Sequence, residues 1–329
     1  MNPPELEIFE AEVIEATGVA DNLLAYLKET IIGQEVLLER LLIGLLANGH
    51  ILLEGLPGLA KTLAVKSLAQ AISAKFNRIQ FTPDILPADI LGTMIYNINN
   101  NEFNVKKGPI FANFILADEI NRAPEKVQSA LLEVMQEHQV TIGNTTHYLE
   151  SPFMVLATQN PIDQNGTYEL PEAQMDRFMM KVVITYPSLE EERIIIRKNI
   201  EQELILDSSF TISQIHKLQA VVKKIHIDSK IEDYILNIIF CTRFPDNYSL
   251  SHLKSYIRFG SSPRGSINLA RAARAYALLK KRTFVIPEDI KAIVFDVLRH
   301  RIGLTYSAIA ENVTADIILK QILDAIPMP

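Results

Sequence analysis

The sequence predicts an α/β fold in which a parallel sheet covered by helices is followed by a small all-helical domain. Before Pro187, short apolar runs alternate with stretches whose apolar residues recur at helical spacing, as a parallel sheet with helical crossovers requires. After Pro187 the helical spacing continues to the end of the chain. We therefore expect an N-terminal helical segment over residues 1–30 that packs on the core, an α/β core over residues 31–186 and a helical domain over residues 187–329.

The predicted sheet has five strands, each a strand-like run of three to five residues. They are Ile51–Leu53, Arg78–Phe81, Phe114–Ala117, Phe153–Ala157 and Lys181–Thr185. A crossover helix is predicted over residues 126–137, where Val127, Leu131 and Val134 share one helical face. These elements give the chain the order that an open parallel sheet needs.

The first strand leads into the segment Gly55-Leu-Pro-Gly-Leu-Ala-Lys-Thr62, which precedes a helix predicted over residues 60–74. A strand, a glycine-rich turn and a Lys-Thr pair at a helix N-terminus form the P-loop arrangement, in which Lys61 would contact the β- and γ-phosphates and Thr62 would bind Mg²⁺. Gly55 and Gly58 let the backbone turn tightly, and the helix N-terminus favours phosphate. Ala60 stands where the pattern has glycine, and the loop can form there if its φ is negative. The alternative is an ordinary strand–turn–helix with a chance Lys-Thr pair.

The third predicted strand ends in two carboxylates, Asp118 and Glu119. This is the Walker B arrangement, in which Asp118 would hold the Mg²⁺ shell and Glu119 would orient and deprotonate the attacking water. Two solvated acids at a strand end are the alternative. The fourth strand is followed by Asn160 and Pro161, and open parallel sheets bind ligands just beyond the carboxyl ends of their strands. The amide of Asn160 could hold water or the γ-phosphate, although Asn before Pro is also a turn signal.

Two arginines complete the pattern. Arg177 lies in the run Asp176-Arg-Phe178, and Arg264 follows Ser262 and Pro263, which predict the N-cap and first turn of a helix. This setting places Arg264 at a helix N-terminus, where an anion is favoured. Taken singly, each arginine would be a surface or ion-pair residue.

The order of these motifs resembles that of the AAA+ ATPases and, among them, the MoxR group. The resemblance extends from about residue 31 to about residue 304. Its closest matches are Gly55–Thr62, Phe81–Gly92, Ala117–Pro124, Ala157–Pro161 and Leu170–Phe178. The resemblance implies a P-loop AAA+ ATPase core with a helical lid.

The resemblance also implies roles for particular residues. Asn160 matches the family's first sensor, Arg177 its arginine finger, which reaches into the neighbouring subunit, and Arg264 its second sensor, in the same or the next subunit. The catalytic set would be Lys61, Glu119, Asn160, Arg177 and Arg264. Nucleotide would be bound by Ile32, Gly33, Gln34, Gly55, Leu56, Pro57, Gly58, Leu59, Ala60, Lys61, Thr62, Leu63, Asp118 and Arg264, and Mg²⁺ by Thr62 and Asp118.

The implied activity is Mg²⁺-dependent hydrolysis of ATP to ADP and phosphate by a homo-oligomeric, hexameric ring. The implied role is chaperone-like remodelling or maturation of a protein partner, in some members one with a von Willebrand A domain. Two hairpins are expected, between Leu91 and Pro109 and between Gln139 and Leu149, where Gly143-Asn144 is a turn signal. In such rings the hairpins face the pore or a partner, and ordinary surface hairpins are the alternative.

Composition agrees with a cytoplasmic ATPase. Of 329 residues, 48% are hydrophobic, the longest uncharged apolar run (Leu41–Ala47) is too short to cross a bilayer, and no secretion signal is recognised. The single cysteine, Cys241, is expected to be a buried small residue. A net charge of −7 makes nucleic acid an unlikely partner. A nucleotide-binding switch with little turnover, which would have no need of Glu119, and a nucleic-acid motor are the alternative functions.

Overall fold

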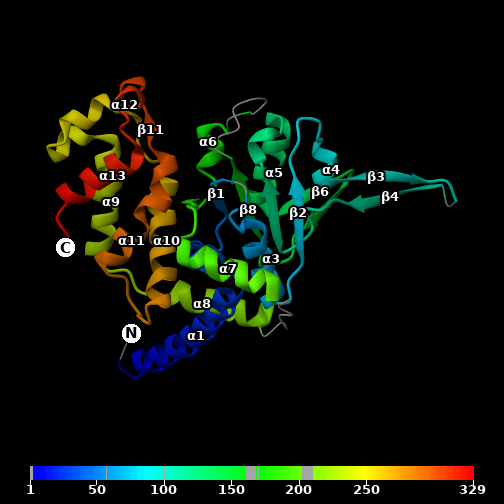
Figure 1. The fold of residues 1–329 in the computed structure, drawn as a ribbon, viewed down its shortest axis with the longest axis horizontal. Helices are drawn as coiled ribbons and strands as arrows, with labels where there is room; N and C mark the ends of the chain where they lie inside the picture. The colour runs from blue at the N-terminus through cyan, green and yellow to red at the C-terminus, as the bar shows by residue number, and fades with distance from the viewer. Residues whose placement is uncertain (1–2, 57, 100, 161–167, 169, 202–209) are drawn as a thin grey trace. The chain divides into compact units, whose positions relative to one another are not determined.

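The computed structural model describes residues 3–56, 58–99, 101–160, 168, 170–201 and 210–329 (Figure 1). The chain forms two compact units. The sheet unit contains residues 23–177 and 182–216, and the helical unit contains residues 1–22, 178–181 and 217–329. Within the described ranges, every helix is too short or too polar to cross a membrane.

The sheet unit is built on a five-stranded sheet with the order β2-β5-β8-β1-β9. Its strands are β1 (Ile51–Glu54), β2 (Phe76–Gln80), β5 (Phe114–Asp118), β8 (Met154–Gln159) and β9 (Met180–Val183), and the first two residues of β9 group with the helical unit. The pairs β2–β5, β5–β8 and β1–β8 are parallel. All five predicted strands are therefore confirmed, and only their ends differ from the prediction. Because β5, β8 and β1 are neighbours in the sheet and run parallel, their carboxyl ends lie side by side.

Among the residues that the structure describes, six helices belong wholly to the sheet unit. They are α2 (Glu35–Leu46), α3 (Lys61–Ala71), α4 (Pro87–Leu91), α5 (Glu125–Glu137), α6 (Glu172–Met175) and α7 (Leu189–Glu201), and the 3₁₀ turn η1 (Ile120–Arg122) follows β5. Helix α5 confirms the predicted crossover. Helix α7 begins with a capping box, in which Ser188 N donates to Glu191 Oε2 (2.6 Å) and Glu191 N donates to Ser188 Oγ (3.4 Å).

Both expected hairpins are present. Strands β3 (Gly92–Asn97) and β4 (Glu102–Lys107) pair antiparallel, as do β6 (Gln139–Ile142) and β7 (Thr145–Tyr148). The second hairpin turns at Gly143, whose φ is +61°, a conformation that glycine adopts without strain. The β3–β4 ribbon extends away from the sheet (Figure 1).

The helical unit contains α9 (Ser229–Arg243), α10 (Pro263–Leu279), α11 (Pro287–Leu298), α12 (Tyr306–Ala310) and α13 (Ala315–Ala325). Its 3₁₀ turns are η2 (Pro245–Tyr248), η3 (Ser251–Ser255) and η4 (Arg299–Arg301). The predicted start of α10 is confirmed, because Ser262 Oγ accepts a hydrogen bond from Arg264 N (3.1 Å) and Pro263 is the first helical residue. The sequence pattern did not predict the short antiparallel pair β10 (Ile257–Phe259) and β11 (Gly303–Leu304).

Helices α1 (Pro3–Thr30) and α8 (Ile212–Lys224) contribute residues to both units, so the units have other limits than the segments expected from the sequence. In the helical unit, α1 is held by the bond from Thr17 Oγ1 to Leu278 O (3.1 Å) and by the ion pair of Lys281 with Asp21 (3.0 Å). Residues 187–216 group with the sheet. Helical spacing shows where a helix lies in the chain but not which body it packs against.

Candidate active site

A pocket of about 410 Å³ lies beyond the carboxyl ends of β1, β5 and β8. It is lined by Gly58, Leu59, Ala60, Lys61, Thr62, Leu63, Arg78, Asp118, Glu119, Thr158 and Asn160. The fold thus brings together the glycine-rich loop, both acids and Asn160, which are far apart in the sequence. Pro57 was also predicted for this loop and lies outside the described residues, while Leu56 is described and does not line the pocket.

Ala60 contradicts the expectation of a negative φ. Its φ is +56° and its ψ is +16°, so it adopts the left-handed conformation instead of the negative φ that was expected. Ala60 is the N-cap of α3, and the chain must reverse there to turn from the loop into the helix. A non-glycine residue in this conformation costs about 1–2 kcal/mol. Gly58, with φ +85°, meets the same requirement without that cost.

Gly55 and Lys61 form the base of the loop. A Cβ atom at Gly55 would lie 2.9 Å from the carbonyl oxygen of Ile184, so the close approach of the chain after β9 requires glycine there. Lys61 Nζ donates a hydrogen bond to the carbonyl oxygen of Gly55. Burial lowers the pKa of Lys61, while the charges of Asp118, Glu119 and Glu54 act to raise it. The lysine is therefore a partly buried cation facing two carboxylates across the pocket.

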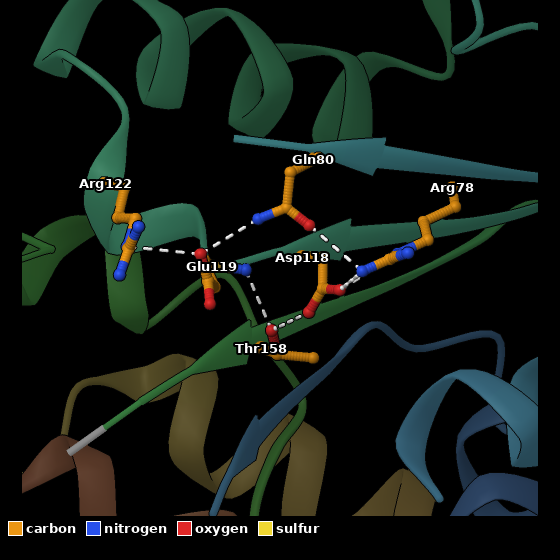
Figure 2. Close-up of polar contacts among 6 residues, drawn as sticks. All are labelled: Arg78, Gln80, Asp118, Glu119, Arg122 and Thr158. Carbon is orange, nitrogen blue, oxygen red and sulfur yellow. Dashed lines mark hydrogen bonds and ion pairs between the residues drawn. The ribbon is translucent and has the colours of Figure 1, made fainter. Parts of the chain in front are cut away.

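Asp118 is held by partners from two neighbouring strands (Figure 2). Its Oδ1 accepts a hydrogen bond from Thr158 Oγ1 (2.7 Å). Its Oδ2 accepts from Nε (3.0 Å) and Nη2 (2.5 Å) of Arg78 on β2. The orientation of this carboxylate is therefore set by one neutral donor and one cationic donor.

Glu119 has an unusual backbone, with φ +58° and ψ +49°. Its N–H donates to Thr158 Oγ1 (2.9 Å), so the single buried hydroxyl of Thr158 joins the two acids. The Glu119 carboxylate accepts from Gln80 Nε2 (2.9 Å) and forms an ion pair with Arg122 Nε (3.1 Å). Figure 2 shows this carboxylate between Gln80 and Arg122.

Four residues of this network were given no role by the sequence analysis, namely Arg78, Gln80, Arg122 and Thr158. One signal was available: Arg78 and Gln80 are two residues apart on β2, so both side chains lie on the same face of the strand. Their use depends on strand order, because β2 pairs with β5 and places Gln80 opposite Asp118. Thr158 could be noticed only as a polar residue ending an apolar run, and it is 2% exposed.

The donors in the pocket fit Mg²⁺. Thr62 and Asp118 line the same pocket and supply a hydroxyl and a carboxylate oxygen, the hard donors that Mg²⁺ prefers. Among the described residues, no group of three or more His, Cys, Asp or Glu side chains could hold a metal. Mg²⁺ is commonly bound through one or two carboxylates together with water and phosphate oxygens, so this sparse donor set suits a metal that arrives with a nucleotide.

A second pocket of about 250 Å³ shares Gly58, Leu59, Ala60 and Leu63 with the lining of the first. Ile32 and Gln34, which were predicted to bind nucleotide, line it together with Pro187, Ile195 and Lys198. Gln34 Nε2 donates to the carbonyl oxygen of Thr185 (3.1 Å), which fixes the segment after β9. Gly33 has φ +74°, and a Cβ there would meet the Glu191 side chain at 2.9 Å.

The two predicted arginines lie elsewhere in the described structure. Arg177 follows α6, is half-buried and is not among the described residues that line either pocket. Arg264 is half-buried in the first turn of α10, in the helical unit. Their roles stay predictions.

Comparison with known proteins places these features in a family. Residues 50–180 match the model of the ATPase family associated with various cellular activities (AAA), and residues 250–322 match the AAA lid domain. Chaperone MoxR1 of Mycobacterium tuberculosis is 47% identical over 302 residues, covering 92% of this chain and 80% of that protein. Protein MoxR of Paracoccus denitrificans is 30% identical over 298 residues, covering 85% of this chain and 87% of that protein.

A solved structure agrees with the sequence comparisons. A crystal structure of a protein from Cytophaga hutchinsonii, described as a candidate ATPase, superposes on this fold with a TM-score of 0.93. The two chains are 47% identical, and the match covers 99% of each.

Proposed function

This chain belongs to the MoxR family of AAA+ ATPases, and we propose that its Mg²⁺-dependent ATPase site is completed by a neighbouring subunit in a homo-oligomeric ring. The network that holds Asp118 and Glu119 through Thr158 at the mouth of the P-loop supports this proposal most directly. A protein that only binds nucleotide has no use for the second carboxylate, that of Glu119, whose backbone is held in a left-handed conformation.

Each residue of the pocket has a separate task. The backbone N–H groups at the start of α3 and the Lys61 ammonium bind phosphate oxygens and offset their charge. Thr62 and Asp118 would hold Mg²⁺, which supplies further charge neutralisation on the phosphates when bound. Glu119 accepts a proton from the attacking water, and Asn160 orients that water through its amide.

Arg177 completes the site from the next subunit. Its place outside both described pockets of its own chain is consistent with action on a neighbour. An arginine supplied in this way stabilises charge in the transition state and is worth about 10³–10⁵ in rate in GTPases. An isolated subunit would therefore turn over ATP very slowly.

The work done with ATP is proposed from the relatives. One of the relatives is named Chaperone MoxR1, and we infer a chaperone-like remodelling or maturation of a partner protein by this chain, with a von Willebrand A domain as one candidate partner type. The ring is proposed as a hexamer, and the cytoplasm as its compartment.

The test is Mg²⁺-dependent ATP hydrolysis as a function of protein concentration, for the wild type, Arg177→Ala, Glu119→Gln and the surface control Arg193→Ala. We expect the wild type and control to gain specific activity with concentration, Arg177→Ala to lose it, and Glu119→Gln to bind ATP without turnover. A flat rate that Arg177→Ala leaves unchanged would contradict the shared site. Unchanged turnover in Glu119→Gln would contradict the role of Glu119.

A further inference from the structure

The three consecutive residues of η4, directly after α11, donate hydrogen bonds to one short stretch of backbone. Arg301 donates from Nη1 to Met179 O (3.1 Å) and from Nη2 to Phe178 O. His300 Nε2 donates to the same Phe178 oxygen (3.2 Å). Arg299 Nη1 donates to Lys181 O (3.0 Å). We call Arg299–Arg301 the basic clamp, and it lies with residues 178–181 in the helical unit.

The clamp is itself held rigidly. Arg299 pairs with Asp296 (2.8 Å) on α11 and with Asp316 (3.0 Å) on α13, and Arg301 donates back to Val297 O. Arg301 and His300 are only 3% and 6% exposed. Side chains so buried have few alternative rotamers, so the positions of the clamped carbonyls are set by the helical unit.

His300 contributes as a neutral donor. Burial, followed by the charge of Arg301, lowers its pKa well below the ordinary value, with the charges of Lys181 and Arg299 acting in the same direction. Its Nδ1 is buried and, within the described structure, has no hydrogen-bond partner. The proton therefore belongs on Nε2, where Phe178 O accepts it.

The clamped stretch begins directly after Arg177. Phe178 is fully buried, and on the other side Arg177 N donates to Gln174 O (3.1 Å). The backbone of Arg177 is thus fixed on both sides while its side chain stays partly exposed. We infer that the basic clamp is a positioning device for Arg177, which sets the direction in which that side chain is presented to the neighbouring subunit. The inference rests on the proposed role of Arg177.

The expected effect follows from geometry. The Arg177 guanidinium lies at the end of a long side chain, so a small rotation of the backbone at residue 178 displaces it by a larger distance. A misplacement of about 1 Å can lower a rate about 10²-fold. Weakening the clamp should therefore lower kcat of the assembled ATPase and leave ATP binding almost unchanged, because no clamp residue lines either described pocket.

The test uses two matched pairs in the full chain. His300→Leu removes the donor to Phe178 O, whereas His300→Gln keeps a donor at a similar reach. Arg301→Lys weakens the clamp, whereas Arg282→Lys weakens a different ion pair of the same unit, that with Asp289. At a temperature well below each Tm, we expect kcat to fall at least about 10-fold in His300→Leu and Arg301→Lys, with KM for ATP within about 2-fold. Arg282→Lys should keep wild-type kcat, and His300→Gln should recover most of it.

Mixed assemblies separate positioning from stability. A subunit with a misplaced finger still has an intact pocket, so His300→Leu mixed with Glu119→Gln should regain ATPase, since the Glu119→Gln subunit lends a correctly placed arginine. Mixing His300→Leu with Arg177→Ala should regain none. Wild-type kcat in both clamp variants, or an equal loss in Arg282→Lys, would overturn the clamp inference. If Arg177→Ala itself hydrolyses ATP normally, the proposed role of Arg177 fails instead.

Discussion

Among the described residues that line the active-site pocket, two that are not glycine have left-handed backbones. Ala60 ends the P-loop with φ +56°, and Glu119 follows β5 with φ +58°. Neither is glycine, so each conformation costs about 1–2 kcal/mol that the surrounding structure must offset. Strain of this kind is tolerated where the position of a functional group depends on it.

Replacing Ala60 with glycine should stabilise the fold. The relief of about 1–2 kcal/mol exceeds the extra chain entropy of glycine, about 0.5–1 kcal/mol, so we expect a net gain of about 0.5–1 kcal/mol. Urea unfolding of Ala60→Gly measures it. Ala64→Gly, inside α3, is the matched control and should lose about 1 kcal/mol. Equal losses in the two variants would show that Ala60 is not strained.

Removing the Thr158 hydroxyl should weaken both stability and catalysis. Thr158→Val has nearly the same shape, but it leaves the N–H of Glu119 and an oxygen of Asp118 without their partner, which costs about 1–3 kcal/mol per buried group. Thr158→Ser retains the hydroxyl and is the control. The free energy of unfolding, measured in urea, and kcat should both be lower in the valine variant and close to wild type in the serine variant. A valine variant with wild-type kcat would mean that Thr158 does not position Glu119.

At the scale of elements, His50 joins three parts of the sheet unit. It lies just before β1, its Nε2 donates to Met135 O on α5 (2.9 Å), and its Nδ1 accepts from Val155 N on β8 (3.0 Å). Both ring nitrogens are engaged in the neutral form. Burial, and to a smaller extent the nearby His138, lowers the pKa of His50 to about 4 although its hydrogen bond to Met135 acts in the opposite direction.

Because the pKa of His50 is lowered, we expect the free energy of unfolding to fall in mild acid. The unfolded state takes up the proton near pH 6.5, whereas the folded state resists it until about pH 4, so stability falls as pH drops through that window. The loss is about 1.4 kcal/mol per pH unit, or about 3 kcal/mol in all. Urea unfolding between pH 7 and pH 4 measures the slope, which His50→Gln should reduce. The exposed residue His216 gives the control His216→Gln, and an unchanged slope in His50→Gln would refute the assignment.

At the scale of the whole molecule, the net charge of −7 bears on the choice of partner. A surface with excess negative charge repels the phosphate backbone of nucleic acids. We expect single-stranded DNA to leave the ATPase rate unchanged at physiological salt. A stimulation that grows as salt is lowered would favour a nucleic-acid motor, and an added acidic protein of similar size serves as a control for nonspecific polyanion effects.

The local elements could be predicted from the amino-acid pattern, and so could most of the residues that line the pocket around the P-loop. Apolar runs and helical spacing located the five strands and α5, because burial of one face imposes a period on the sequence. Motifs such as Gly55–Thr62 and Asp118-Glu119 predict phosphate and metal ligands, because those tasks require particular side chains at particular spacings.

The long-range partners of these residues depend on how the elements pack together. The strand order places Arg78 and Gln80 beside the two acids, and Thr158 between them. Three further features could not be predicted from the sequence pattern. They are the left-handed backbone at Ala60, the grouping of residues 1–22 with the helical unit and the contact of the basic clamp with residues 178–181. A local pattern reports which face of an element is buried. The neighbour that buries it is chosen by packing across the whole chain, and that choice leaves no periodic trace in the sequence.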